Sequence, residues 1–120
     1  MREFMAITKA VSDPNRVRVL LALGRGELCV CQVTELFGFA PSTVSKHLSL
    51  LHQAGLIQSR KSGRWVYYRL PEEAPLVVRE ALDWVQKSLG KSEQAAADAG
   101  RLNRILRTDV KELCRRQSGR

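Results

Sequence analysis

Three cysteines are the side chains of this 120-residue chain that are best suited to chemistry. Cys29 and Cys31 are separated by one residue, whereas Cys114 lies close to the other end of the chain. Because three is an odd number, a closed set of intrachain disulfides would leave one cysteine unpaired. Thiolates are the ligands that soft metal and metalloid centres prefer. The alternative is that Cys29 and Cys31 are only small buried hydrophobic side chains.

The spacing of the first two cysteines limits how they can act together. On an ideal helix, residues two positions apart point about 200° away from each other. Cys29 and Cys31 therefore cannot hold one small ion from within a regular helix, and binding requires a frayed or unwound helix start. A thiol enzyme has no support, because neither His47 nor His52 is near them in sequence. We interpret His47 as a structural histidine at a helix packing edge.

Composition places the chain in a broad class. A hydrophobic content of 44% supports one small globular domain. The apolar runs are too short to span a membrane, and the first ten residues lack the features of a signal peptide. These features predict a cytoplasmic protein with reduced thiols and no membrane partner. The net charge of +8 favours a polyanionic partner, most simply nucleic acid.

The positive charge is concentrated in two segments. Residues 41–70 contain five basic and no acidic side chains, which gives +5. Residues 101–120 contain seven basic and two acidic side chains, again +5. The second segment is equally well explained as a solubilising tail. The first segment coincides with the predicted fourth helix and the hairpin that follows it.

Apolar spacing, caps and turn residues predict five helices and a hairpin. Asp13 is the expected N-cap of the second helix, with Pro14 at its first position. Ser62 and Gly63 supply the hairpin turn. Beyond Gly90, residues 91–100 resemble a linker or a frayed helix, and residues 102–113 carry one more amphipathic stripe. The expected helices cover 3–12, 14–23, 28–37, 41–54 and 76–89, and the expected strands cover 56–61 and 65–70.

The third helix, a short turn and the fourth helix form a helix-turn-helix, in which the second helix enters the DNA major groove. Its exposed start offers small or basic hydrogen-bonding side chains, and the following hairpin is basic near its tip, as in a wing that lies along phosphates. The alternative is a merely solvated polar surface. RNA is a weaker interpretation, because no aromatic-rich strand offers a stacking platform. The predicted DNA contacts are Ser42, Thr43, Ser45, Lys46, Arg60, Lys61 and Arg64.

Three strings carry a family resemblance: Glu-Leu-Cys-Val-Cys at 27–31, Ser-Thr-Val-Ser-Lys-His-Leu at 42–48 and Ala-Gly-Leu at 54–56. Together they resemble the arsenical-resistance repressor (ArsR/SmtB) family of winged-helix metalloregulators. The resemblance implies a mainly α fold with a small β-hairpin, a homodimeric winged helix-turn-helix. It also implies a repressor that binds a double-stranded palindromic operator until arsenite or antimonite binds to Cys29 and Cys31.

The sequence departs from the family pattern at one position. The arsenic-sensing branch has a third cysteine three residues after the second, and here that position is Thr34. Three alternatives stay open: Cys114 completes the site from the same or the other subunit, water, hydroxide or a small thiol completes it, or Cys114 is an idle surface thiol. The resemblance also implies that zinc sensors of this family that use the fifth helix need histidine and carboxylates there. The fifth helix of this chain contains no histidine, so zinc is disfavoured. An alternative with the same fold is a redox- or persulfide-responsive repressor that uses one motif cysteine and Cys114.

The first and fifth helices carry more apolar residues than one small core needs, which predicts a two-fold dimer interface there. We expect residues 1–90 to form the winged helix-turn-helix and dimerisation domain. Residues 91–120 are then a basic C-terminal extension, either helical or partly disordered. The residues predicted to exceed the core are Phe4, Ile7, Val11, Leu82, Trp84, Val85 and Leu89.

Overall fold

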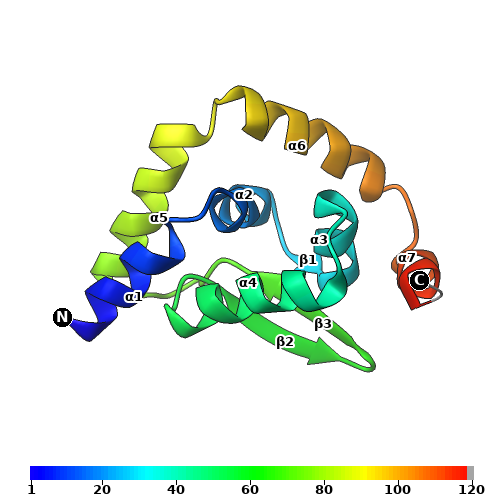
Figure 1. Cartoon of the computed structure of the whole chain (residues 1–120), viewed down its shortest axis with the longest axis horizontal. Coiled ribbons are helices and arrows are strands. Elements are labelled where there is room, and N and C mark those ends of the chain that lie inside the picture. The colour runs from blue at the N-terminus through cyan, green and yellow to red at the C-terminus, as the bar shows by residue number, and fades with distance from the viewer. Residues whose placement is uncertain (119–120) are drawn as a thin grey trace.

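A computed structural model describes residues 1–118 of the chain. Its elements follow the order of a winged helix-turn-helix with two further helices at the C-terminal end (Figure 1). None of the helices in residues 1–118 is long and apolar enough to cross a membrane. The elements are α1 (Arg2–Ala10), α2 (Pro14–Leu23), β1 (Leu28–Cys29), α3 (Val30–Phe37), α4 (Pro41–Gln53), β2 (Gln58–Ser62), β3 (Trp65–Arg69), α5 (Leu76–Leu89), α6 (Glu93–Ile105) and α7 (Val110–Ser118).

Local signals set the ends of the first helices. Asp13 caps α2 as predicted, because its carboxylate accepts a hydrogen bond from the backbone N–H of Asn15 at 2.8 Å. Pro14 occupies the first position of the helix, where a missing N–H costs nothing. Gly38 ends α3 with a φ of 71°, a left-handed conformation that glycine adopts without steric cost. The chain can therefore turn within three residues into α4.

The sheet has three antiparallel strands in the order β1-β3-β2. The sequence predicts only the hairpin β2–β3; β1 has two residues and pairs with β3 through Leu28 opposite Tyr68 and Cys29 opposite Tyr67. The third helix is therefore shorter than expected, beginning at Val30 instead of position 28. This difference matters because it moves Cys29 out of the helix.

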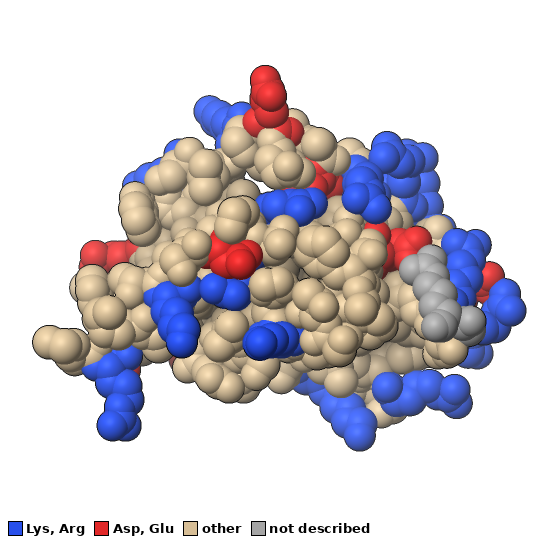
Figure 2. Space-filling view, viewed as in Figure 1, with Lys and Arg blue, Asp and Glu red and all other residues tan. Residues whose placement is uncertain are grey.

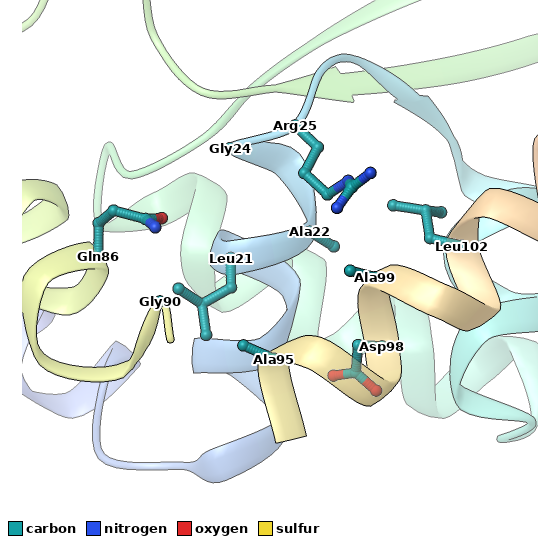
Figure 3. Close-up of a pocket in the computed structure, with 10 residues that line it drawn as sticks. All are labelled: Leu21, Ala22, Gly24, Arg25, Gln86, Gly90, Ala95, Asp98, Ala99 and Leu102. Atoms are coloured by element: carbon teal, nitrogen blue, oxygen red, sulfur yellow. The ribbon is translucent and has the colours of Figure 1, made fainter. Parts of the chain in front are cut away.

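Helix α6 occupies the segment for which the sequence predicts either a linker or a frayed helix. It runs across α2 and α3. Figure 3 shows Ala22 of α2 and Ala95 and Ala99 of α6 facing the same space, where these two helices meet. Such small side chains allow two helices to approach closely. A cavity of about 230 Å³ remains in this region, and Gln86 of α5 and Gly90 at the end of that helix also line it.

A charged pair fixes α6 to α2. The guanidinium of Arg18 donates two hydrogen bonds to the carboxylate of Asp98, at 2.8 and 2.9 Å, and lies 4.5 Å from the ring centre of Phe37. Burial raises the pKa of Asp98, but hydrogen bonds from Arg18 and Gln94 outweigh this effect and hold that pKa below its ordinary value. The pair is therefore ionised at neutral pH and ties the extension to the core.

Helix α7 packs on α3 through Leu113, which is 1% exposed. Figure 1 places α7 and the turn of the hairpin at one end of the molecule, and α1 with α5 at the other end. The amphipathic stripe expected over 102–113 is thus divided between two helices, with Leu102 and Ile105 buried on α6. Both helices pack against α3.

Candidate nucleic-acid interface and thiol cluster

The three cysteines meet at the N-terminal end of α3. Their sulfur atoms all lie within 4.8 Å of one another, although Cys114 comes from α7. Cys31 and Cys114 are joined by a disulfide with a Cα–Cα separation of 5.5 Å, and Cys29 is a free, buried thiol. The prediction of three reduced thiols therefore differs from the structure, in which the sulfurs of Cys31 and Cys114 are bonded to each other.

The junction between β1 and α3 explains how Cys29 and Cys31 share one site. Cys29 is the N-cap of α3 and has extended backbone angles, whereas Cys31 is the second residue of the helix. Since Cys29 lies outside the helix, the two side chains do not have to point about 200° away from each other, as they would within a regular helix. The side chain of Gln32 accepts a hydrogen bond from the backbone N–H of Cys29 at 2.8 Å and stabilises this junction.

Thr34 occupies the position of the missing third cysteine and does not supply a soft ligand. Its hydroxyl donates to the backbone carbonyl of Val30 at 2.8 Å and is buried within α3. Cys114 reaches the cluster from the same chain, and its helix is held by Gln117, whose amide donates to the carbonyl oxygen of Cys31 at 2.8 Å. Sequence reasoning missed Gln117, which no motif marks.

The start of α4 is exposed where the sequence predicts contacts with DNA. Val44, Leu48 and Leu51 face the core, as predicted. The opposite face leaves four small or basic side chains exposed to solvent, and Pro41 supplies the first residue of the helix without disturbing its hydrogen bonds. These four exposed residues are Ser42, Thr43, Ser45 and Lys46.

A polar contact with α2 supports α4. Arg16 of α2 donates to the backbone carbonyls of Ala10 and Lys9, and it also contacts the Nδ1 atom of His47 at 3.2 Å. Since a guanidinium only donates, Nδ1 must accept, and the proton of a neutral His47 ring is on Nε2. The structural role expected for His47 agrees with this contact. Arg16 is a positioning residue that sequence reasoning did not identify.

The wing is connected directly to the thiol cluster. Cys29 of β1 pairs with Tyr67 of β3, and Tyr67 pairs with Arg60 of β2, so the three residues form one row across the sheet. Arg60 lies over the ring of Tyr67 and forms two hydrogen bonds with Glu27, at 2.6 and 2.9 Å. This ion pair lowers the pKa of the Glu27 carboxyl. Of the wing cations predicted to contact DNA, Arg60 therefore already has an acidic partner.

The remaining wing cations are exposed at the turn of the hairpin, where Lys61 and Arg64 lie. Figure 2 shows basic side chains projecting from the lower right edge of the molecule, where Figure 1 places the hairpin, and more of them along the right edge near α7. Basic side chains are thus present at the end of the molecule that holds the wing and the C-terminal helix, and others lie elsewhere on the same face.

Part of the predicted dimer surface is exposed and part is not. Phe4 on α1 and Trp84 on α5 are 58% and 66% exposed, and Leu89 is exposed as well. Ile7 and Val85 instead pack into the chain's own core. The apolar surface at this end of the molecule is therefore smaller than the sequence suggests, but it still contains large side chains.

The fold and the exposed α4 define a winged helix-turn-helix regulator that binds DNA. Residues 13–59 match the family model of bacterial regulatory proteins of the arsR family. The arsenic resistance transcriptional regulator ArsR1 of Pseudomonas putida is 38% identical over 106 residues, which cover 85% of this chain and 81% of that protein. The arsenical resistance operon repressor of Escherichia coli is 37% identical and covers 62% of this chain and 65% of its own.

Among solved structures, a homodimeric winged helix-turn-helix DNA-binding domain from Mycobacterium bovis aligns with a TM-score of 0.62 and 28% identity, covering 72% of this chain and 78% of its own. The chain belongs to the arsR family of bacterial regulatory proteins. The resemblance noted in the sequence and the winged helix-turn-helix fold are both confirmed. As a member of this family, the chain is a DNA-binding transcriptional regulator and not an enzyme.

Proposed function

We propose that this protein is a dimeric cytoplasmic repressor that is released from a palindromic operator by trivalent arsenic or antimony. The observation that carries the proposal is the cluster of three cysteine sulfurs within 4.8 Å of one another beside the helix-turn-helix. Trivalent arsenic and antimony are soft centres that favour thiolate ligands in a pyramidal arrangement. Three reduced sulfurs in one cluster fit that preference, and similarity to regulators of arsenic resistance supports it.

The inducer ligands in this proposal are Cys29, Cys31 and Cys114, all from one chain. The reach of α7 to the cluster supports Cys114 as the third ligand more strongly than water, hydroxide, a small thiol or a cysteine of the other subunit. The buried hydroxyl of Thr34 is already bonded to the helix backbone, which argues against its participation. The ligand set therefore joins the strand–helix junction to the C-terminal helix.

Two connections can carry the effect of inducer binding to DNA. Helix α3, which begins at the cluster, packs against α4, so a shift in its first turn moves the recognition helix. The row of Cys29, Tyr67 and Arg60 connects the same cluster to the wing. An inducer releases DNA only if it binds more tightly to the form that does not bind the operator. In this proposal, the two connections are the routes by which the inducer distinguishes the two forms.

In the repressing form, we assign base-edge and phosphate contacts to the exposed start of α4 and phosphate contacts to the wing. A dimer formed through α1 and α5 would place two such surfaces on operator half-sites about one helical turn, or a multiple of it, apart. The exposed Phe4 and Trp84 support that interface. The DNA-contact set remains Ser42, Thr43, Ser45, Lys46, Arg60, Lys61 and Arg64.

The test is a mobility-shift titration of the reduced protein on its operator with increasing arsenite. The wild type should be released by arsenite, whereas the Cys29→Ser/Cys31→Ser variant should bind the operator equally well and resist release. Arsenate, which is not a soft trivalent centre, is the control ligand and should leave both complexes intact. Release of the double variant by arsenite would show that the proposed site is wrong.

A second candidate function uses the same sulfurs as a redox or persulfide switch, and the disulfide between Cys31 and Cys114 favours it. Two thiols and hydrogen peroxide yield one disulfide and two molecules of water, which removes two of the three inducer ligands. Release of DNA by peroxide should then depend on Cys31 and Cys114 but not on Cys29. Cys29→Ser thus separates the two functions, because it should abolish the arsenite response and keep the peroxide response.

A further inference from the structure

Helix α7 borders the two elements that carry the proposed DNA contacts. Three of its residues, Cys114, Gln117 and Ser118, line a hollow of about 420 Å³. Ser45 of α4 and Arg64 of the hairpin turn line the same hollow. The exposed start of α4 and the wing together form the DNA-binding surface, and α7 therefore lies at the edge of this surface.

The solvent-facing side of α7 carries an excess of positive charge. The side chains of Arg115 and Arg116 are 75% and 52% exposed, and both donate hydrogen bonds to the carboxylate of Glu112. The guanidinium of Arg115, with a smaller effect of Arg116, holds the pKa of Glu112 below its ordinary value, so this carboxyl is ionised at neutral pH. Lys111 is exposed as well. These four residues form the α7 cluster, whose three cations and one anion leave a net charge of +2.

The number of cations per carboxylate distinguishes the α7 cluster from the ion pair of the wing. In the wing, Glu27 pairs with the single guanidinium of Arg60, so that pair has no net charge. In the α7 cluster, one carboxylate is shared by two guanidinium groups. Positive charge therefore remains available on α7 to attract a polyanion.

The location of α7 decides which part of a DNA duplex it can reach. Figure 1 places α7 and the turn of the hairpin at one end of the molecule, and α1 with α5, the proposed dimer interface, at the other end. Figure 2 shows basic side chains both near α7 and near the hairpin. In a dimer formed through α1 and α5, the α7 helix of each protomer is therefore farther from the two-fold axis than α4. Its DNA contacts would fall outside the half-site that α4 reads.

We propose that the α7 cluster binds phosphates of the duplex that flanks each operator half-site; the inference rests on the proposed function for the position of the operator on the DNA-binding surface. The partner is double-stranded DNA of any sequence, because phosphate contacts carry no direct sequence information. Each cation that neutralises a phosphate releases counterions, which makes the added affinity dependent on salt. The α7 cluster thus lengthens the DNA site and does not change which bases are read.

The same arrangement makes Glu112 a competitor of the DNA. Its carboxylate lies 2.6 Å from a guanidinium nitrogen of Arg115 and 3.2 Å from one of Arg116, and a phosphate has to compete with it for both side chains. Removing the charge of Glu112 should therefore strengthen the contact with flanking DNA. If Glu112 served only to stabilise α7, its removal would bring no such gain.

The experiment compares two duplexes in a fluorescence-anisotropy titration of the reduced protein. Both contain the operator palindrome that the wild type selects from random-sequence duplexes, and one has about ten further base pairs of arbitrary sequence, roughly one helical turn, on each side. The wild type should bind the longer duplex about tenfold more tightly at about 0.1 M salt, with a steeper salt dependence. Arg115→Gln/Arg116→Gln should lose this gain and bind the shorter duplex as the wild type does, which also shows that the variant is folded. Glu112→Gln should at least double the gain.

Arg25→Gln/Arg104→Gln is the matched control and should keep the full gain. It removes two exposed cations beside α6, since Arg104 lies on that helix and Arg25 is bonded to Asn103 of the same helix. Figure 1 places α6 on the opposite side of α2 from α4.

Each outcome supports or overturns the inference. If the wild type binds both duplexes equally, or if the two double variants lose the gain to the same extent, the α7 cluster is only a solvated surface and the proposed function stands. A Glu112→Gln variant with no larger gain than the wild type would overturn the competition between Glu112 and DNA. If the wild type selects no palindrome from the random duplexes, the proposed function fails together with this inference.

Discussion

The side-chain amide of Gln117 donates a hydrogen bond of 2.8 Å to the backbone carbonyl oxygen of Cys31, and its nitrogen lies 3.3 Å from the carboxylate of Glu35. Helix α7 is thus joined to α3 by polar contacts that do not depend on the state of the sulfur atoms. When the disulfide is reduced, these contacts and the buried Leu113 are what hold Cys114 beside the other two thiols.

We expect Gln117→Leu to loosen α7 in the reduced protein, because the carbonyl of Cys31 loses its partner. The thiol of Cys114 should then be alkylated by iodoacetamide several times faster than in wild type, as measured by mass spectrometry over time. Gln53→Leu removes an exposed glutamine at the end of α4 and is the control. Equal alkylation rates in wild type and Gln117→Leu would show that this contact does not position α7.

Removing the acidic partner of Arg18 should destabilise the whole domain. Asp98→Asn leaves a partly buried guanidinium without its charge partner, and we expect the free energy of unfolding to fall by about 3 kcal/mol, the lower end for a broken buried pair. The measurement is urea denaturation followed by circular dichroism. Asp83→Asn breaks the exposed pair with Lys87 and should change stability by less than about 0.5 kcal/mol.

The same pair predicts an acid dependence of stability. The pKa of Asp98 is lower in the folded chain than its ordinary value of 3.8. A lowered carboxyl pKa stabilises the folded state above the unfolded value, and that contribution is lost as the pH falls through the folded value. The stability of Asp98→Asn should therefore fall less than that of the wild type below pH 3.8. Parallel acid limbs for the two proteins would contradict this prediction.

Neutralising the exposed cations at the hairpin turn should reduce the salt dependence of operator binding. Lys61→Gln and Arg64→Gln should each lower the slope of log affinity against log salt by about 2 for the proposed dimer, because each removes one phosphate contact in each protomer and the slope changes by about 1 per contact. Arg60→Gln should have a smaller effect, since Glu27 already partners that guanidinium. Lys87→Gln on α5 is the matched control. Slopes that are unchanged in all the wing variants would exclude the wing from the DNA contact.

The exposed tryptophan of α5 should be central to self-association. Trp84→Glu places a charge in the proposed apolar interface, and sedimentation velocity should show a monomer at concentrations where the wild type is dimeric. Leu106→Glu introduces the same charge at an exposed apolar residue outside α1 and α5 and should remain dimeric. A dimeric Trp84→Glu variant would show that the interface lies elsewhere.

Much of the winged domain could be predicted because its signals are local. Asp13 and Pro14 start α2, and Gly38 ends α3, each through backbone geometry that depends only on neighbouring residues. The core face of α4 follows from helical spacing alone. Strand β1 was missed because two residues cannot show an alternating pattern, and only pairing with β3 defines them.

The candidate site could be predicted only in part. The spacing of Cys29 and Cys31 predicts that both belong to the site, but the position of Cys114 depends on how α6 and α7 pack. The alanine-rich start of α6 has little apolar area, so the sequence does not distinguish a linker from a frayed helix there, although the small side chains allow α6 to lie close to α2. The partnership of Arg60 with Glu27 likewise joins residues that are far apart in sequence.

The sulfur atoms of the cluster come from two positions near the start of the domain and one that is 83 residues later than Cys31. During synthesis, the helix-turn-helix and wing emerge from the ribosome well before α7 does. The DNA-reading half of the chain is therefore complete earlier than the ligand set. A chain that lost its last helix to proteolysis would keep its DNA-binding surface and lack its third thiol, and under the proposed function it would repress without responding to arsenite.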